Sequence, residues 1–341
     1  MTRRRLLILA IAACGLLMLV EAGRFLLLPA SSVDREVVLD VAEGASLKAV
    51  AQKLADAGVI NRPAYFVLLG RLLGAQRGIQ AGDYALRTTM RPLEVMHKLT
   101  SGAIMQTAVT IPEGFNIQEI ARGLEEQGVM PAKAFLAAAA DPAVRQEAGI
   151  SAPSLEGYLF PSTYYVSHHT QPAELVRRMV RQFEESTRAL DWSLAGARGL
   201  SRHQLVTLAS IIEKETSKDD ERPLVASVFY NRLKLGIPLQ SDPTVIYALN
   251  GFDGDLRRVD LEVKSPYNTY RVAGLPPGPI SNPGLASLQA ALHPASTHYL
   301  YFVSKNDGTH FFSMTLAEHE KAVAKYQVLP ARAKRATARR S

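Results

Sequence analysis

The sequence predicts an α+β chain: an N-terminal transmembrane helix, a small α+β module, and a larger, mainly helical α+β domain with a β-hairpin. Three observations predict this: an apolar N-terminal run, a strand-and-helix pattern that occurs twice, and capped helices beyond about residue 153. A chain of 341 residues exceeds one ordinary domain. The expected segments are a cytoplasmic stub with the transmembrane helix at 1–29, the small α+β module at 30–105 and a second, repeat-like α+β segment at 106–152. The larger, mainly helical domain follows at 153–329, and a basic tail at 330–341.

Segment 1–29 has the pattern of a membrane anchor. Three arginines precede the apolar run Leu6–Val20, which resumes as Phe25–Leu28 after Glu21 and Arg24. A bilayer-spanning helix needs about 20 predominantly apolar residues. The basic flank predicts a cytoplasmic N-terminus, with the rest of the chain on the other side of the membrane.

Two alternatives to an uncleaved anchor remain open. Cys14 follows a sequence similar to a lipoprotein cleavage box, although apolar sequence continues beyond it, and a signal peptide could instead be cleaved near Ala22. Cys14 is the only cysteine, which excludes an intrachain disulfide or a cysteine-based metal site.

The basic charge of the chain lies at its ends. Of a formal net charge of +7, eight basic residues fall in the terminal segments, so the rest carries −1. A body without net positive charge argues against nucleic-acid binding. We expect 330–341 to be a solvated, disordered basic tail, with contact to acidic lipid or polymer as the alternative.

An internal repeat relates residues 38–60 to residues 107–130. Glu43-Gly44 corresponds to Glu113-Gly114, and Gly58-Val59 to Gly128-Val129. Each copy is expected to form a strand, a glycine turn, a helix with apolar spacings of three and four, and a glycine stop.

The first copy continues with a helix expected at 63–73 and a strand at 82–86. This order of elements resembles LysM domains, which bind N-acetylated glycans. A spacer without glycan-binding activity would show the same pattern, because a fold does not determine function.

The segment 153–329 carries the strongest helix signals. Ser201 is expected to cap one helix, Thr315 and Glu318 form a capping box for the last, and Lys305–Gly308 is typical of a hairpin turn. The remaining helices are expected at 172–190, 223–236, 242–250 and 282–293.

The helix 205–216 contains the strongest candidate for chemistry. Projected at 100° per residue, Glu215 falls in the apolar stripe of Leu208, Ile211 and Ile212, whereas Glu213 falls towards its edge. Burial raises the pKa of a carboxyl group and would suit Glu215 to general-acid catalysis. The alternative is a glutamate that reaches solvent at the helix end.

Glycoside cleavage often uses two carboxylates, and no obvious second one shares this helix face. Asp219 is expected beyond the helix end, and Asp242 precedes Pro243 as a helix cap would. A single carboxylate can still suffice where a hydroxyl of the sugar itself attacks the anomeric carbon in place of water. The sequence leaves hydrolysis open.

Three loops have the polar and aromatic side chains of a sugar site, although each also fits an ordinary loop. They are 240–244, 265–270 and the proline-rich 274–280. Other chemistries are poorly represented: the histidines are dispersed, no phosphate-binding loop follows a strand, and Ser210 lies within a helix.

Specific motifs resemble those of the YceG-like family of endolytic murein transglycosylases. The resemblance covers nearly the whole chain. The motifs are 155–161 (LEGYLFP), 209–216 (ASIIEKET), 231–233 (NRL), 239–247 (LQSDPTVIY), 267–270 (YNTY), 274–280 (GLPPGPI) and 293–295 (HPA).

The resemblance implies a single-pass inner-membrane lyase with its catalytic domain in the periplasm. It would cleave the MurNAc-GlcNAc β-1,4 bond of nascent strands, leave 1,6-anhydroMurNAc ends, and end strand elongation beside the peptidoglycan synthases. It needs no cofactor or metal. The family's catalytic glutamate maps to Glu215, with Glu213 as the fallback. The expected substrate-binding residues are Glu156, Tyr158, Gln240, Asp242, Thr244, Tyr267, Asn268 and Tyr270.

Two other functions fit the same modules. A non-catalytic glycan-binding scaffold of the cell-wall synthesis machinery would keep the aromatic loops without needing a buried glutamate. A hydrolase would produce reducing ends instead of anhydro ends.

Overall fold

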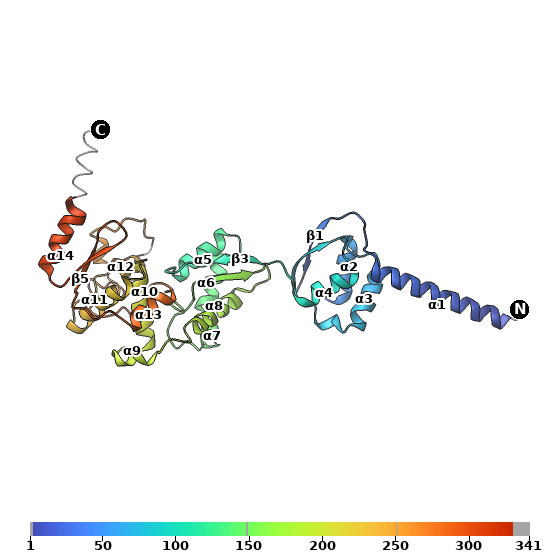
Figure 1. Cartoon of the computed structure of the whole chain (residues 1–341), viewed down its shortest axis with the longest axis horizontal. Helices are drawn as coiled ribbons and strands as arrows, with labels where there is room; N and C mark the ends of the chain where they lie inside the picture. The colour runs from blue at the N-terminus through green and yellow to red at the C-terminus, as the bar shows by residue number, and fades with distance from the viewer. Residues whose placement is uncertain (1–2, 148, 250, 330–341) are drawn as a thin grey trace, which may run out of the picture. The chain divides into compact units, whose positions relative to one another are not determined.

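The computed structural model describes residues 3–147, 149–249 and 251–329, so the expected basic tail lies outside the described residues. The chain forms two compact units (Figure 1). Unit 1 comprises Met1–Ala108 with Tyr165–Thr170, and unit 2 comprises Val109–Tyr164 with Gln171–Ser341.

The first helix, α1, spans Arg3–Leu27. Throughout the described part of the chain, no helix combines the length and the apolar character needed to cross a bilayer. The transmembrane anchor predicted for residues 1–29 is therefore not supported. The unbroken apolar stretch is limited to Leu6–Val20, because Arg3–Arg5 precede it and Glu21 follows.

Unit 1 has the order of elements that the sequence predicts. β1 (Glu36–Val41) is followed by α2 (Leu47–Asp56), α3 (Pro63–Leu72), a 3₁₀ turn at Ala75–Arg77, β2 (Gly82–Arg87) and α4 (Pro92–Ser101). β1 pairs antiparallel with β2, so that Leu39 lies opposite Tyr84. The α+β character of the module is confirmed, whereas its likeness to LysM domains stays a prediction.

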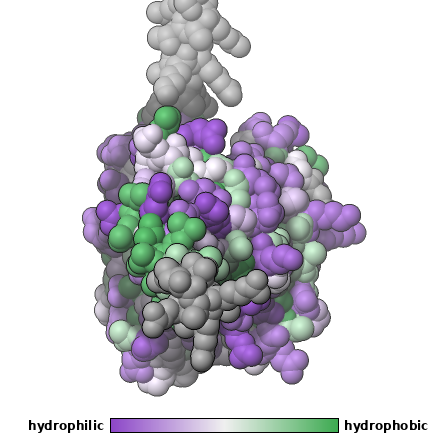
Figure 2. All heavy atoms as spheres, turned by 90° about the vertical axis from the view of Figure 1, so that its right-hand side faces the viewer, coloured by the Kyte–Doolittle hydropathy of each residue, from purple (hydrophilic) through white to green (hydrophobic). Residues whose placement is uncertain are grey.

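Unit 1 buries one apolar core and exposes further apolar side chains. Leu54, Phe66 and Tyr84 are fully buried in the core. Figure 2 shows hydrophobic residues gathered on the face that carries α1. On this unit Leu68 and Leu72 of α3 are exposed.

The internal repeat is confirmed at the level of secondary structure. The second copy forms β3 (Thr107–Thr110) and α5 (Ile117–Glu126). Gly44 and Gly114 take positive φ angles of 72° and 77° at the turns. The stop glycines Gly58 and Gly128 also take positive φ, at 74° and 67°. These backbone conformations are costly for residues with a Cβ, which explains the matched glycines.

The second copy also continues into helices and a partner strand. α6 (Ala132–Ala140) and α7 (Pro142–Glu147) follow α5, and β3 pairs with β4 (Thr163–Val166). Both copies therefore place their first strand in a two-stranded sheet with a strand that follows the helices.

The rest of unit 2 is a helical assembly with one hairpin (Figure 1). β5 (Tyr301–Ser304) and β6 (His310–Ser313) pair antiparallel, which confirms the predicted hairpin. The helices are α8 (Pro172–Ser186), α9 (Ser193–Ala197), α10 (Arg202–Glu215), α11 (Arg222–Leu235), α12 (Asp242–Ala248), α13 (Leu285–Leu292) and α14 (Leu316–Val323), with a 3₁₀ turn at Asp260–Glu262 and a π-helical turn at Ala324–Val328.

α8 ends four residues before the predicted Leu190. Thr187 is the C-cap, and its hydroxyl donates to the carbonyl of Phe183 at 2.7 Å. Beyond Thr187 the backbone bonds are of the i→i+3 type, from Arg188 to Glu185 and from Leu190 to Thr187, so the α-helix does not continue to Leu190.

Candidate active site

α10 is the central helix of unit 2, and its sequence explains its position. Ser201 accepts from the backbone of Gln204, whose side chain accepts in return from the Ser201 backbone, forming a capping box. Every residue from 205 to 212 is buried. The helix packs against α11 and α13 and ends at Glu215.

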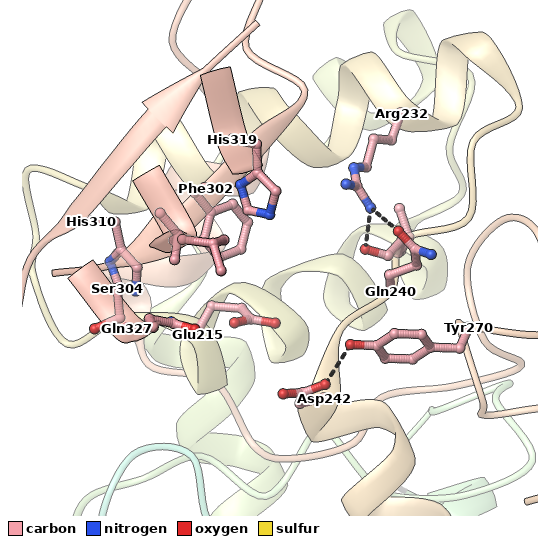
Figure 3. Close-up of a pocket in the computed structure, with 13 residues that line it drawn as sticks. Glu215, Arg232, Gln240, Asp242, Tyr270, Phe302, Ser304, His310, His319 and Gln327 are labelled. Atoms are coloured by element: carbon pink, nitrogen blue, oxygen red, sulfur yellow. Dashed lines mark hydrogen bonds between the residues drawn. The ribbon is translucent and has the colours of Figure 1, made fainter. Parts of the chain in front are cut away.

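Glu215 lines a cavity of about 410 Å³ in unit 2 (Figure 3). The hydroxyl of Ser241 donates a hydrogen bond to its Oε1 at 2.5 Å. Desolvation raises the pKa of Glu215 to about 7, against the opposing effect of the Ser241 hydrogen bond. The negative charge of Asp242 raises this pKa further, and Arg232 lowers it. At neutral pH the group can both donate and accept a proton.

Glu213 has its acceptor atoms engaged inside the protein. Its Oε2 accepts from the backbone of Gly284 at 2.9 Å, and its Oε1 lies 3.4 Å from Nη2 of Arg222. Only 6% of its side chain is exposed. The geometry therefore favours Glu215 over Glu213 as the acid/base.

Three of the expected substrate-binding residues line the same cavity: Gln240, Asp242 and Tyr270. The hydroxyl of Tyr270 donates to Oδ1 of Asp242 at 2.6 Å (Figure 3). Gln240 takes a positive φ of 53°, which is uncommon for a residue other than glycine. Their position suits them to contact a ligand next to Glu215.

Arg232 holds the turn that contains Gln240. Its Nη1 donates to the carbonyls of Pro238 and Leu239 at 3.0 and 2.9 Å and to Oε1 of Gln240 at 3.2 Å. Its Nε donates to the carbonyl of Leu300 at 2.7 Å. Desolvation lowers the pKa of Arg232. The arginine joins the polar loop to the strand hairpin and adds a cation to the cavity wall.

Glu156 lies away from the cavity and is only 4% exposed. It accepts from the backbone of Ile117 at 3.2 Å, from the hydroxyl of Tyr247 at 3.2 Å and from Nδ2 of Asn282 at 3.0 Å. Desolvation raises the pKa of Glu156 to about 8, although these hydrogen bonds lower it. These contacts suit it to join α5, α12 and the 282 loop.

The other expected binding residues also make internal contacts. Tyr158 is buried and hydrogen-bonds Nδ1 of His203 at 3.0 Å. Thr244 and Asn268 are fully buried: Thr244 donates to the carbonyl of Ser241 at 2.6 Å, and Asn268 donates to those of Leu261 and Val263. Tyr267 packs on Tyr247, with 4.9 Å between the ring centroids. Their direct contact with substrate stays a prediction.

Sequence reasoning missed the opposite wall of the cavity. This wall comes from β5, β6, α14 and the turn after it, which contribute Phe302, Val303, Ser304, His310, His319, Val323 and Gln327. Figure 3 shows His310, Phe302 and His319 on the hairpin side of the cavity. These residues follow Glu215 by more than 80 positions, and their spacing carries no signal of a site.

One group of side chains in unit 1 has the atoms of a metal site. Asp40, Asp83 and His169 each place a ligand atom within 4.8 Å of the others. His169 Nε2 already lies 2.9 Å from Asp40 Oδ1, and Nζ of Lys53 lies 3.4 Å from Asp40 Oδ2. Because Asp40 already hydrogen-bonds His169 and pairs with Lys53, these contacts explain the cluster without a cation.

The sequence model of the YceG-like family matches residues 39–325, which is most of the chain. This chain belongs to the YceG-like family. A relative from Bacillus subtilis, named endolytic murein transglycosylase, is 36% identical over 321 residues, with 89% of each protein covered. A Streptococcus pneumoniae protein of the same name is 28% identical over 88% of this chain, and the chain covers 60% of that relative.

The fold of the family has also been seen in a crystal. A YceG-like protein from Listeria monocytogenes is 33% identical and superposes with a TM-score of 0.58. The match covers 84% of this chain and 98% of that one. The family resemblance noted in the sequence is thus confirmed.

Proposed function

We propose that this YceG-like protein is an endolytic lytic transglycosylase that cleaves peptidoglycan glycan strands, with Glu215 as its single acid/base. The observation that carries the proposal is the desolvated carboxyl group of Glu215 in a polar cavity, with a pKa raised to about 7. The names of the relatives support the substrate class.

In the first step, protonated Glu215 donates its proton to the glycosidic oxygen as the C1–O4 bond between MurNAc and GlcNAc breaks. In the second, the Glu215 carboxylate takes the proton of the MurNAc C6 hydroxyl while O6 bonds to C1. The products are a 1,6-anhydroMurNAc end and a GlcNAc end with a free hydroxyl. Water is not consumed, and Glu215 regains its proton.

Asp242 supports a one-acid mechanism without acting as a second acid. It lines the same cavity as Glu215, and its negative charge raises the pKa of Glu215. Tyr270 anchors it by a hydrogen bond at 2.6 Å. We propose that Asp242, Gln240 and Tyr270 also hydrogen-bond the sugar. An anion next to the anomeric carbon would stabilise the positive charge that develops there in the transition state.

The proposal extends to the biological role. Internal cleavage of nascent strands would end their elongation, and we propose that this occurs next to the peptidoglycan synthases. Because peptidoglycan lies outside the cytoplasm, the catalytic part would work there. We further propose that the LysM-like module of unit 1 holds the glycan strand.

The test is Glu215→Gln, which keeps the shape of the side chain but cannot exchange a proton. We expect loss of glycan cleavage by at least about 100-fold, the range attributed to general acid–base catalysis. Glu262→Gln, an exposed position of the same unit, is the control and should cut as the parent does. Purified strands are digested and the released ends are weighed by mass spectrometry.

The products decide among the alternatives. Anhydro ends support the transglycosylase, whereas reducing ends would identify a hydrolase. Undiminished cleavage by Glu215→Gln would refute the assignment of the acid/base. A parent protein that binds strands but never cuts them would be the non-catalytic scaffold.

A further inference from the structure

A histidine on the far wall of the cavity is held by a carboxylate. The backbone N–H of His310 in β6 donates to Oε1 of Glu221 at 2.8 Å, and its ring Nδ1 lies 2.7 Å from Oε2. Glu221 precedes α11 and is 8% exposed. Two contacts from one carboxylate fix both the strand and the ring of His310.

The hydrogen-bond partner of Nδ1 determines which nitrogen of the His310 ring carries the hydrogen and which one is left for a ligand. Burial opposes ionisation of Glu221, but hydrogen bonds from the His310 ring and backbone outweigh it and hold the pKa of Glu221 below its usual value. An ionised carboxylate only accepts hydrogen bonds, so Nδ1 must carry the hydrogen. Nε2 is then the ring nitrogen left for a ligand, an acceptor in the neutral ring and a donor in the imidazolium. Nε2 makes no hydrogen bond to another described residue, and the ring lines the cavity.

The same carboxylate is tied to the end of the catalytic helix. The hydroxyl of Thr216, the residue after Glu215, donates to Oε2 of Glu221 at 3.3 Å. Thr216 is itself buried and accepts from the backbone of Lys218 at 3.1 Å. A continuous series of hydrogen bonds therefore sets His310 relative to the helix end that carries Glu215.

The other histidine of the cavity lacks such support. His319 stacks on Tyr301, and its buried Nδ1 has no hydrogen-bond partner. Desolvation lowers the pKa of His319. Of the two cavity histidines, His310 is the one whose tautomer and orientation are set by a carboxylate, as is typical of histidines that act in a site.

We infer that His310 is a substrate-binding residue whose Nε2 hydrogen-bonds a sugar hydroxyl in the Glu215 cavity, with Glu221 and Thr216 as positioning residues. The inference rests on the proposed function. It adds a contact from the C-terminal hairpin to the proposed sugar contacts Gln240, Asp242 and Tyr270 beside Glu215.

Two amide substitutions separate the two nitrogens of the ring. His310→Asn places an amide near the position of Nδ1, which can still donate to Glu221 but leaves the cavity side empty. His310→Gln places an amide near Nε2, which can still hydrogen-bond the sugar. If Nε2 binds substrate, the asparagine variant loses on the order of tenfold or more in kcat/KM, and the glutamine variant loses less.

A structural role predicts the opposite order. If His310 serves only to hold Glu221, His310→Asn keeps its activity and His310→Gln loses it, which would overturn the inference. Thermal melting of both variants shows whether a loss follows from destabilisation. If the two variants lose activity to the same extent and their melting temperatures fall by the same amount, the loss reflects destabilisation, and this result would also contradict the inference.

A measurement without a change at position 310 avoids dependence on folding. The ring ¹⁵N signals of the Glu215→Gln protein are recorded while oligosaccharides of alternating GlcNAc and MurNAc are added. The Nε2 signal of His310 should shift on binding. Signals of His203 should not, because its Nδ1 contacts Tyr158 and its Nε2 contacts the carbonyl of Pro277 at 3.2 Å.

The two proposals can fail separately. Bound oligosaccharide with an unchanged His310 signal would refute the inference alone, whatever the activity of the Glu215 variant. Undiminished cleavage by Glu215→Gln would refute the acid/base assignment even if the His310 signal moves.

Discussion

At the residue scale, the balance of effects on Glu215 sets its chemistry. Desolvation favours the protonated form, whereas the hydrogen bond from Ser241 favours the ionised form. The result is a carboxyl group with a pKa of about 7, poised between the two forms near neutral pH. Ser241 is buried and belongs to the motif 239–247. Through its hydroxyl, this loop donates a hydrogen bond to Glu215 at the end of α10.

Ser241→Ala tests this balance. Activity as a general acid requires the proton, so the rate falls as pH rises through the pKa of Glu215. Loss of the Ser241 hydrogen bond removes an effect that lowers this pKa, so the alkaline limb of the rate profile should move to higher pH. The kcat/KM is measured on glycan strands across pH.

The control is Ser304→Ala, a serine of the same cavity whose hydroxyl accepts from the backbone of Asn306 at 3.1 Å. Its alkaline limb should match that of the parent. A Ser241→Ala profile that moves to lower pH, or does not move, would contradict the role of this hydrogen bond.

At the element scale, the close approach of backbone segments positions α10. Gly157 has a φ of +87°, and a Cβ there would lie 2.5 Å from Cγ of Pro279 and 2.9 Å from Cγ1 of Val206. Val206 belongs to α10, so the glycine lets the 155–161 motif and the proline-rich loop meet on this helix. The two motifs singled out in the sequence therefore meet here.

Gly157→Ala should be strongly destabilising for two reasons, the left-handed backbone and the overlap with Pro279. We expect a loss of about 3 kcal/mol in the free energy of unfolding, measured by urea denaturation. Gly128→Ala is the matched control: its φ is +67°, but its Cβ would meet nothing within 4 Å. It should cost about 1 kcal/mol. Equal losses at the two positions would show that packing against Pro279 is unimportant.

At the scale of the whole molecule, each compact unit has its own buried residues. Leu54 of α2 lies in the core of unit 1, and Leu208 of α10 lies within unit 2; both are fully buried. Separate cores permit separate unfolding, and a two-state description then applies to each unit, not to the chain.

Calorimetry should accordingly show two transitions. Leu54→Ala and Leu208→Ala should each destabilise their own unit by about 2–5 kcal/mol, because each leaves a cavity in a packed core. Leu54→Ala should leave the Glu215 cavity of unit 2 intact below its first transition. A single transition that both substitutions lower equally would instead mean that the units unfold together.

Local signals were enough to predict much of the fold. The repeat, the helices and the hairpin follow from periodicity, caps and glycine stops, which act within a few residues. α8 ends early because the backbone bonds beyond Thr187 tighten to the i→i+3 type, a change that the apolar pattern does not reveal. The membrane span predicted for residues 1–29 is not supported by any helix among the described residues.

The sequence by itself determined which residue would be the acid/base candidate, since the position of Glu215 in an apolar stripe follows from helix geometry alone. Only the tertiary structure decided what surrounds it. It brought His310 and Phe302 to the cavity from a distant hairpin, and it buried Thr244 and Asn268 behind the loop that displays Asp242. The physical reason is that helical periodicity is a short-range property, whereas a cavity is formed by side chains that packing brings together from across the chain.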